Sequence, residues 1–370
     1  MEFYATTPPG IEDIAAEEIA NLCGAITDIK KDKGRIFFSA SIKDIPKLNY
    51  CARCTERFVL LLKRGNLISL NDLYLEIKEI DFEFLNEKSF AIRSMRTGSH
   101  EFTSMDIARV AGQAVIDSFM EQYGKRLKVN LNNPDVIVRV DVIEDEYLVG
   151  IDTTGDSALH KRWWRVYNHP AHLNSTIAVA MLKLAEWKSG KSLLDPMCGS
   201  GTILIEAALM ALGIAPGKNR EFAFSKLHDF SKFYEFNSCE DKFDQIGEIR
   251  GIEKFRKHVE GAKRNAENAG VSNLINFDVG DVKDVKGSYE CIVTNPPYGL
   301  RIARKGVIKK LYDTLCKTLK RCLIGKAVLI TSEDKVMEKC LKENSLKVEH
   351  ERYVKYGGLL TKIFVVTSQD

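Results

Sequence analysis

The most constraining feature of the sequence is a regular alternation of strand-like and helix-like segments from residue 192 onward. Short apolar runs predict strands, and the amphipathic stretches between the first six of them predict helices. Such alternation is typical of an α/β fold with a mostly parallel, doubly wound sheet. The expected strands are Ser192–Leu194, Glu248–Gly251, Ile275–Val279, Glu290–Val293, Ala327–Ile330, Lys347–Lys355 and Thr361–Val366.

The last two expected strands are joined only by the short turn from Tyr356 to Leu360. A parallel crossover needs roughly a dozen residues or more, so these two strands must pair as a hairpin. We therefore expect a seven-stranded sheet in which one strand runs antiparallel to its neighbours.

The first half of the chain predicts a mixed α+β region. Strand-like runs and two amphipathic helices alternate there less regularly, and the pattern breaks between Thr153 and Pro170. We expect an N-terminal region at residues 1–50, a second domain at 51–152, a linker at 153–170 and the α/β domain at 171–370. The expected front elements are the strands Phe3–Thr7, Arg35–Ala40, Arg57–Arg64, Asp135–Val140 and Glu146–Asp152, and the helices Ile11–Cys23 and Asp106–Tyr123.

Composition narrows the class of protein. Hydrophobic residues make up 45% and charged residues 28%, as in soluble globular proteins. The sequence has no apolar run long enough for a membrane span and no secretory pattern at its start, so we expect a cytoplasmic protein. Nine cysteines favour reduced thiols over a disulfide framework. The single CxxC pair, Cys51 and Cys54, lacks further ligands, so no metal site is expected.

A glycine-rich turn follows the first strand of the back half, and Thr202 opens a helix after it. Such a turn lets the backbone approach a ligand and aims the N–H groups of the helix at it. It lacks both the GxGxxG of dinucleotide enzymes and the Lys-Ser/Thr of a P-loop. It could hold a nucleotide phosphate or the methionine moiety of S-adenosylmethionine. Asp195, just before the glycines, favours the ligand that carries an amino group.

Carboxylates end the next two strands. Glu253 is placed to accept hydrogen bonds from ribose hydroxyls, and Asp281 to contact an adenine amino group. Each could alone be a surface residue at a strand end, but their succession favours a cofactor site. The candidate cofactor-binding residues are Asp195, Met197, Cys198, Gly199, Ser200, Gly201, Thr202, Glu253, Lys254, Asp281, Val282 and Asn295.

The fourth strand runs into the candidate catalytic residues Asn295, Pro296, Pro297 and Tyr298. The Asn295 side-chain oxygen and the Pro296 carbonyl could accept both N–H bonds of a planar amino group and so shift its lone pair toward an electrophile. The two prolines fix φ and remove two N–H donors. Tyr298 could stack on a base, a contact worth about 1–3 kcal/mol. We expect direct in-line transfer without a metal or a covalent intermediate. The competing interpretation is a merely rigid Pro-Pro turn.

Taken together, these motifs resemble the class I, Rossmann-like RNA methyltransferases over roughly residues 170–370. Asn-Pro-Pro-Tyr resembles the signature of members that act on planar amino or amide nitrogens. Residues 214–224 resemble an insertion of guanine-N2 methyltransferases of ribosomal and transfer RNA. The front half resembles a THUMP domain after a small ferredoxin-like region, on residues 93–102, Ser104, Asp106, Gly112, Ala114 and Val115.

The order of these parts is similar to that of archaeal and bacterial tRNA (guanine-N2) methyltransferases that modify position 6 of the acceptor stem. The resemblance implies S-adenosylmethionine as cofactor, a guanine held by residues 295–298, and a THUMP region that grips the tRNA 3′ end. One departure is in the linker. The family has a basic-Gly-Tyr-Arg pattern, whereas this chain has Arg162-Trp163-Trp164-Arg165.

Basic residues gather after the Asn-Pro-Pro-Tyr motif. The net charge is only +3, but residues 301–326 hold nine Lys/Arg and one acid, Asp313. A local excess of this size makes a positive surface. A partly double-stranded stem is read mainly through phosphates and shape. The candidate RNA-binding residues are Arg93, Arg96, Arg301, Arg304 and Lys305. The alternative is a solvated basic helix face.

Other functions remain open at this stage. The same chemistry could act on guanine in ribosomal RNA, or the same loop on adenine in DNA or glutamine in a release factor. The THUMP-like module argues against the last two. A catalytically silent RNA-binding factor is the alternative from another class, and the intact motifs argue against it. We expect a tRNA partner, no membrane and a monomer.

Overall fold

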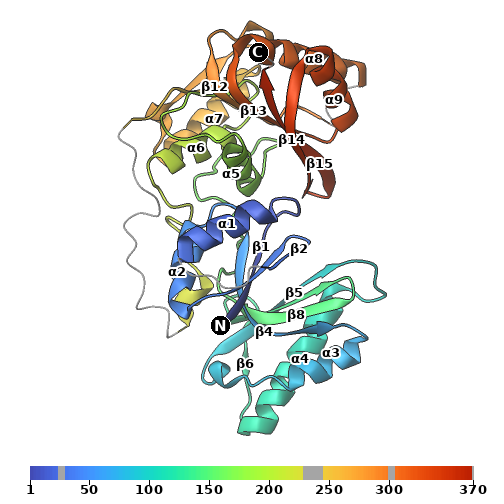
Figure 1. The fold of residues 1–370 in the computed structure, drawn as a ribbon. Coiled ribbons are helices and arrows are strands. Elements are labelled where there is room, and N and C mark those ends of the chain that lie inside the picture. The colour runs from blue at the N-terminus through green and yellow to red at the C-terminus, as the bar shows by residue number, and fades with distance from the viewer. Residues whose placement is uncertain (24–29, 228–244, 299–304, 369–370) are drawn as a thin grey trace.

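The computed structural model describes residues 1–23, 30–227, 245–298 and 305–368. It has two layered parts, each built on one sheet (Figure 1). The front half, drawn in blue to green, lies below the back half, drawn in green to red.

The front half forms one eight-stranded sheet in the order β2-β3-β1-β4-β8-β7-β5-β6. The strand β4 pairs antiparallel with β1 on one side and with β8 on the other. The first strands of the chain and the later front strands therefore share a single sheet. Its strands are β1 (Glu2–Thr6), β2 (Lys30–Asp32), β3 (Arg35–Ser39), β4 (Arg57–Asn66), β5 (Ser89–Thr97), β6 (Lys128–Val129), β7 (Val136–Ile143) and β8 (Glu146–Asp152).

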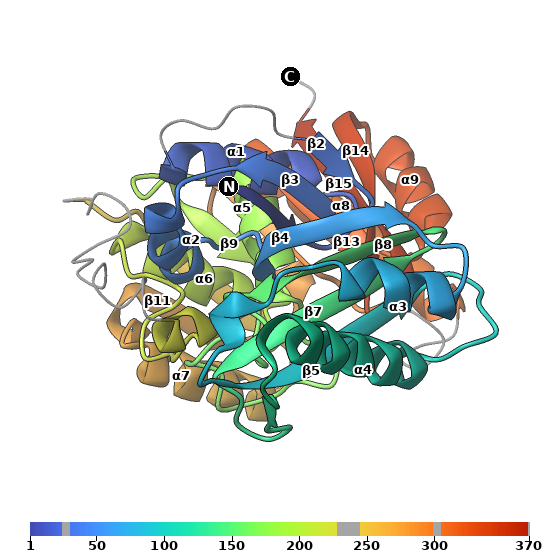
Figure 2. The same ribbon diagram turned by 90° about the horizontal axis from the view of Figure 1, so that it is seen from below.

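Helices cover one face of this sheet, and Figure 2 shows α3 and α4 lying across β5 and β7. Helix α4 begins at a capping box, in which Thr103 and Asp106 satisfy each other's backbone N–H, and it ends at the left-handed Gly124. The prediction of a helix over 106–123 is confirmed, with two further residues at its start. The front helices are α1 (Glu12–Cys23), α2 (Ile45–Cys51), α3 (Leu70–Lys78) and α4 (Ser104–Tyr123).

The back half contains a seven-stranded sheet in the order β11-β10-β9-β12-β13-β15-β14. The first five strands of that order are parallel, and β15 runs antiparallel to both β13 and β14. This confirms the predicted mostly parallel sheet with a terminal hairpin. Its strands are β9 (Leu193–Asp195), β10 (Ile249–Glu253), β11 (Ile275–Val279), β12 (Tyr289–Thr294), β13 (Leu323–Thr331), β14 (Leu346–Tyr356) and β15 (Leu359–Ser368).

The predicted helix between β11 and β12 is wrong. Only a 3-10 turn at Val282–Asp284 lies there, because the residues between Val279 and Tyr289 are too few for a helix and its two connections. The other back helices are present as expected. The helices of this half are α5 (Ser175–Leu184), α6 (Thr202–Ala211), α7 (Arg256–Ala269), α8 (Lys305–Cys322) and α9 (Asp334–Glu343).

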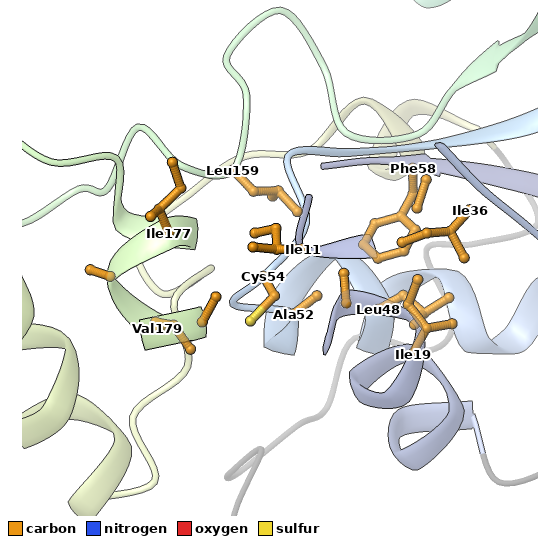
Figure 3. Packing of buried hydrophobic residues seen from close by; sticks show 14 of the residues in the cluster. Ile11, Ile19, Ile36, Leu48, Ala52, Cys54, Phe58, Leu159, Ile177 and Val179 are labelled. Carbon is orange, nitrogen blue, oxygen red and sulfur yellow. The ribbon is translucent and has the colours of Figure 1, made fainter. Parts of the chain in front are cut away.

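One hydrophobic core extends across both halves. Figure 3 shows Ile177 and Val179 of α5 facing Ile11, Cys54 and other apolar side chains of the front half. All four of these residues are fully buried. Continuous burial of apolar surface therefore fixes how the two halves sit on each other.

A buried ionic group reinforces this interface. Glu206 on α6 accepts hydrogen bonds from Arg162 Nε at 2.9 Å and Nη2 at 3.4 Å. The Arg53 guanidinium lies 3.9 Å from the same carboxylate. Arg162 also donates to the carbonyls of Leu159 and Arg53. Arg53 and Glu206 are fully buried and Arg162 nearly so, so the linker and the front half both meet the back half at Glu206.

The N-terminal turn contacts the C-terminal hairpin. The Lys355 amide donates to the Pro9 carbonyl at 2.9 Å. Arg352 donates to the Gly10 carbonyl and to Asp13 Oδ1, at 3.3 and 2.6 Å. A Cβ at Gly10 would lie 2.0 Å from the Tyr353 carbonyl oxygen, so the two backbones touch.

The cysteines correct one expectation. Among the residues that the structure describes, seven cysteines are free thiols, including Cys54 and Cys198, but Cys51 is disulfide-bonded. The expectation of reduced thiols is therefore wrong at Cys51. Within the described ranges, no cluster of His, Cys, Asp and Glu is placed to hold a metal ion. None of the helices in those ranges has the length and apolar character that a membrane crossing requires.

Candidate active site

The candidate site lies at the carboxyl ends of the parallel strands. Strand β9 pairs with β10 on one side and with β12 on the other, and β11 pairs with β10. Because parallel strands end at one edge of the sheet, this register brings together Asp195, Glu253, Asp281 and Asn295. The sequence prediction of carboxylates at successive strand ends therefore corresponds to one contiguous region.

The glycine turn needs glycine for conformational reasons. Gly199 has φ +52° and Gly201 has φ +78°, both in the left-handed region. Gly201 is the N-cap of α6, and a Cβ there would lie 3.0 Å from Phe277 Cζ. The turn therefore leaves the backbone at the start of α6 without a Cβ at these two positions, and its Gly199 and Gly201 amides donate to Glu253 Oε2 and to the Cys198 carbonyl.

Asp195 connects the glycine turn to the catalytic loop. Its Oδ1 accepts hydrogen bonds from the Thr294 hydroxyl at 2.7 Å and from the Met197 amide at 3.1 Å. Burial raises the pKa of the Asp195 carboxyl to about 7, although both hydrogen bonds oppose the rise, and the charge of Glu253 adds to it. A cationic group bound beside Asp195 would favour its charged form.

The next two carboxylates hold the loops around them. Glu253 Oε2 accepts from the Gly199 amide at 3.2 Å, and Oε1 accepts from the Phe255 amide at 3.0 Å. Asp281 Oδ2 pairs with the exposed Lys254 ammonium at 3.2 Å. Burial acts to raise the pKa of Asp281, but hydrogen bonds from the Lys283 amide and Lys254 outweigh it, and the pKa is lowered. Each carboxylate oxygen has a second lone pair left for a ligand hydroxyl or amino group.

The most informative atom of the site is Asn295 Oδ1. It is buried and has no hydrogen-bond partner among the residues that the structure describes. A buried acceptor left in this state costs about 1–3 kcal/mol. Thr294, directly before it, is fixed by Asp195, and Pro297, two residues later, accepts from the Tyr312 hydroxyl at 3.3 Å. Asn295 thus presents an acceptor that a ligand N–H group would satisfy.

Two residues to which the sequence assigned no role, one in the linker and one on α7, join the linker to the glycine turn. Arg165 donates to the Thr202 hydroxyl and the Ser175 hydroxyl, each at 3.2 Å. Asn265 of α7 accepts from the amides of residues 166 and 167 and donates to the Ser200 carbonyl at 3.1 Å. The linker is therefore bound to the cofactor turn. The basic end of Arg162–Arg165 was a visible signal for Arg165, whereas Asn265 had none.

His169 is a further residue that the sequence did not assign. Its ring lies 3.8 Å from where a Cβ of Gly199 would be, and 4.2 Å from the His258 ring, centroid to centroid. Burial, followed by the proximity of His258, lowers the pKa of His169 to about 4. The imidazole beside the glycine turn is therefore neutral at physiological pH.

The predicted RNA-binding residues lie in different surroundings. Arg93 forms a two-pronged pair with Asp156, at 2.7 and 3.0 Å, and Arg96 donates to the Gly98 carbonyl at 3.1 Å. Arg301 and Arg304 lie outside the described residues. Lys305 is the first residue of α8.

Three family models match successive parts of the chain. Residues 2–59 match the RlmL ferredoxin-like domain, residues 68–152 the THUMP domain, and residues 162–362 the RMKL-like methyltransferase domain. The chain belongs to the RMKL-like methyltransferase family. This RMKL-like methyltransferase has the ferredoxin-like and THUMP regions in front, in the order that the sequence predicted.

Full-length relatives support the same assignment. The chain is 54% identical over 367 residues to the tRNA (guanine(6)-N2)-methyltransferase of Archaeoglobus fulgidus, covering 99% of this chain and 92% of that one. It is 46% identical to the protein of the same name from Methanocaldococcus jannaschii, covering 99% and 100%. It is 31% identical to the ribosomal RNA large subunit methyltransferase K/L of Aliivibrio fischeri, covering 92% of this chain and half of that protein.

Solved structures resemble the whole chain. A possible methylase from Clostridium difficile 630 is 32% identical, with a TM-score of 0.86 over 100% of this chain and 98% of that one. TrmN from Thermus thermophilus is 25% identical, with a TM-score of 0.74 over 100% and 99%. The arrangement of the two halves therefore recurs in complete chains.

Proposed function

We propose that the protein transfers a methyl group from S-adenosylmethionine to the exocyclic N2 of guanine at position 6 in the acceptor stem of tRNA. The observation that carries this proposal is the buried, unsatisfied Asn295 Oδ1 at the end of β12. The names of the two archaeal relatives support the substrate and the position.

The residues around the glycine turn suit S-adenosylmethionine. The cofactor supplies an electrophilic methyl group on a sulfonium. Asp195 would hold its ammonium group, and its carboxylate would lie at the start of α6. Glu253 and Asp281 accept from ribose and adenine, with Lys254 and Val282 beside them. The same proposal places Met197, Cys198, Ser200 and Gly201 in the turn itself.

The Asn-Pro-Pro-Tyr loop prepares the nucleophile. The lone pair of the guanine amino nitrogen is delocalised into the ring, so the nitrogen attacks poorly. When Asn295 Oδ1 and the Pro296 carbonyl accept its two N–H bonds, the nitrogen is held in line and its lone pair is available. Tyr298 stacks on the base, and Pro297 keeps the loop rigid. The bound cofactor would supply the methyl carbon to this nitrogen, which would release one amino proton to water.

The front half recognises the RNA in this proposal. Residues 1–50 form the ferredoxin-like region, 51–152 the THUMP domain that grips the 3′ end, 153–170 the linker and 171–370 the catalytic domain. Arg93, Arg96, Arg301, Arg304 and Lys305 contact phosphates. If each makes one contact, log affinity falls with log salt at about 0.7–0.9 per contact. The protein acts as a cytoplasmic monomer.

The test is methyl transfer to unmodified tRNA transcripts, followed by mass spectrometry of the nucleosides. We expect N2-methylguanosine, mapped to position 6. Asn295→Ala should abolish turnover and leave tRNA binding largely intact, while Asn273→Ala, an exposed asparagine of the same domain, should act as wild type. Normal turnover in Asn295→Ala would disprove the role given to Asn295. Product in ribosomal RNA transcripts alone would move the substrate to the class of the Aliivibrio fischeri relative.

A further inference from the structure

Beneath the catalytic loop lies a buried pair of hydroxyl groups. Tyr312 on α8 and Thr331 at the end of β13 are both fully buried. The Tyr312 hydroxyl lies 2.7 Å from Thr331 Oγ1 and 3.3 Å from the Pro297 carbonyl oxygen. These contacts join two elements of the back half to the Asn-Pro-Pro-Tyr loop.

The direction of these hydrogen bonds follows from the groups themselves. A carbonyl oxygen only accepts, so the single proton of Tyr312 points to Pro297. The Thr331 hydroxyl must then donate to the Tyr312 oxygen, and it accepts in turn from the Glu333 amide at 2.9 Å. The result is a one-way chain from the Glu333 N–H to the Pro297 carbonyl. Chains of this kind polarise each successive bond and strengthen it.

The loop offers few other points of attachment. Pro296 and Pro297 have no backbone N–H, so this dipeptide can be held only through its carbonyls or by packing. On its N-terminal side, the Thr294 hydroxyl is bound to Asp195 at 2.7 Å. On its C-terminal side, the Pro297 carbonyl is bound to Tyr312. Asn295 and Pro296 lie between these two fixed points.

We propose that Tyr312 is a positioning residue, which holds the Pro297 carbonyl so that Asn295 Oδ1 and the Pro296 carbonyl keep the spacing of an amino group. The proposal rests on the function given above to this loop. Tyr312 touches no reacting atom. Its hydroxyl binds the Pro297 carbonyl, while Asn295 Oδ1 and the Pro296 carbonyl remain free to accept from the substrate.

The chemistry of Tyr312 suits this task. Burial raises the pKa of its phenol well above the ordinary value, although the hydrogen bond with Thr331 opposes the rise. The group therefore keeps its proton and remains a donor throughout the pH range of the reaction.

The test compares Tyr312→Phe with Tyr289→Phe. Tyr289 is also buried, begins β12 and loses comparable contacts, since its hydroxyl donates to the Lys286 carbonyl and accepts from Arg250. We expect Tyr312→Phe to lower kcat about tenfold or more, as small misplacements of reacting groups do, and to change KM for S-adenosylmethionine less than about twofold. Tyr289→Phe should keep the wild-type kcat.

Hydrogen exchange gives a readout that does not depend on the substrate. The amides of Asn295 and Tyr298 should exchange faster in Tyr312→Phe, and those of the glycine turn should not. Thr331→Val should have a smaller effect in the same direction, and Thr331→Ser a smaller one still, because serine keeps the hydroxyl.

Two results would overturn the proposal: wild-type kcat and loop exchange in Tyr312→Phe, or equal losses in Tyr312→Phe and Tyr289→Phe, which would indicate a general loss of stability. If the wild-type protein makes no N2-methylguanosine, the proposed function fails by itself. The exchange comparison still decides the role of Tyr312 in that case.

Discussion

Replacing Glu206 by glutamine should destabilise the protein more than any surface change. The carboxylate is fully buried, and Arg162, only 5% exposed, donates two hydrogen bonds to it. Glutamine keeps the shape but removes the negative charge, which leaves the buried guanidinium without its counter-charge. Breaking a buried ion pair costs about 3–5 kcal/mol. Because Arg162 keeps its bonds to the Leu159 and Arg53 carbonyls, we expect the lower end, about 3 kcal/mol.

Urea unfolding followed by tryptophan fluorescence measures this loss, since Trp164 of the linker is fully buried in the shared core. Glu260→Gln, on the exposed face of α7, is the matched control and should change the free energy of unfolding by less than about 0.5 kcal/mol. A loss below about 1 kcal/mol in Glu206→Gln would refute the reasoning, because the two guanidinium groups would then be solvated rather than buried.

Three further substitutions test other contacts. Gly201→Ala forces a Cβ to φ +78° and against Phe277, so calorimetry should show about tenfold weaker binding of S-adenosylmethionine. Burial raises the pKa of Asp195, so the stability that its protonated form contributes is present below about pH 4 and is lost as the pH rises through about 7. As the pH is raised from 5 to 8, the free energy of unfolding should therefore fall in the wild type relative to Asp195→Asn. Gly10→Ala should cost more than about 2 kcal/mol in urea unfolding because its Cβ meets the Tyr353 carbonyl, whereas Gly124→Ala, with open space around it, should cost about 1 kcal/mol.

Local signals explain how much of the fold was predictable. Each strand of the back half is a short apolar run, and the short link between β14 and β15 permits only a hairpin. The continuous front sheet was not predictable, because it depends on β4 pairing with β1 and β8 across distant parts of the chain. The helix expected between β11 and β12 was a wrong prediction, because it continued the alternation of strands and helices across a connection that is too short to hold a helix.

The same distinction applies to the site. Asp195, Glu253 and Asn295 could be proposed as site residues because each stands at a strand end beside a recognisable turn. The residues that hold them could not. Tyr312 and Asn265 lie inside amphipathic helices with no local motif, and their contacts join segments 15 to 99 residues apart. Only the tertiary structure shows which helix face meets which loop.

The contact between the Pro9–Gly10 turn and β14 sets an order of events during synthesis. Gly10 leaves the ribosome 342 residues before Arg352, its partner across this contact. If synthesis proceeds at about 5–20 residues per second, roughly 20 to 70 s pass between the synthesis of this turn and that of the β14 residues that it contacts. The early strands can pair meanwhile, but their outer turn faces water. A chain released before the hairpin is made would keep that turn open to proteases, so the final strands act as the closing step of assembly.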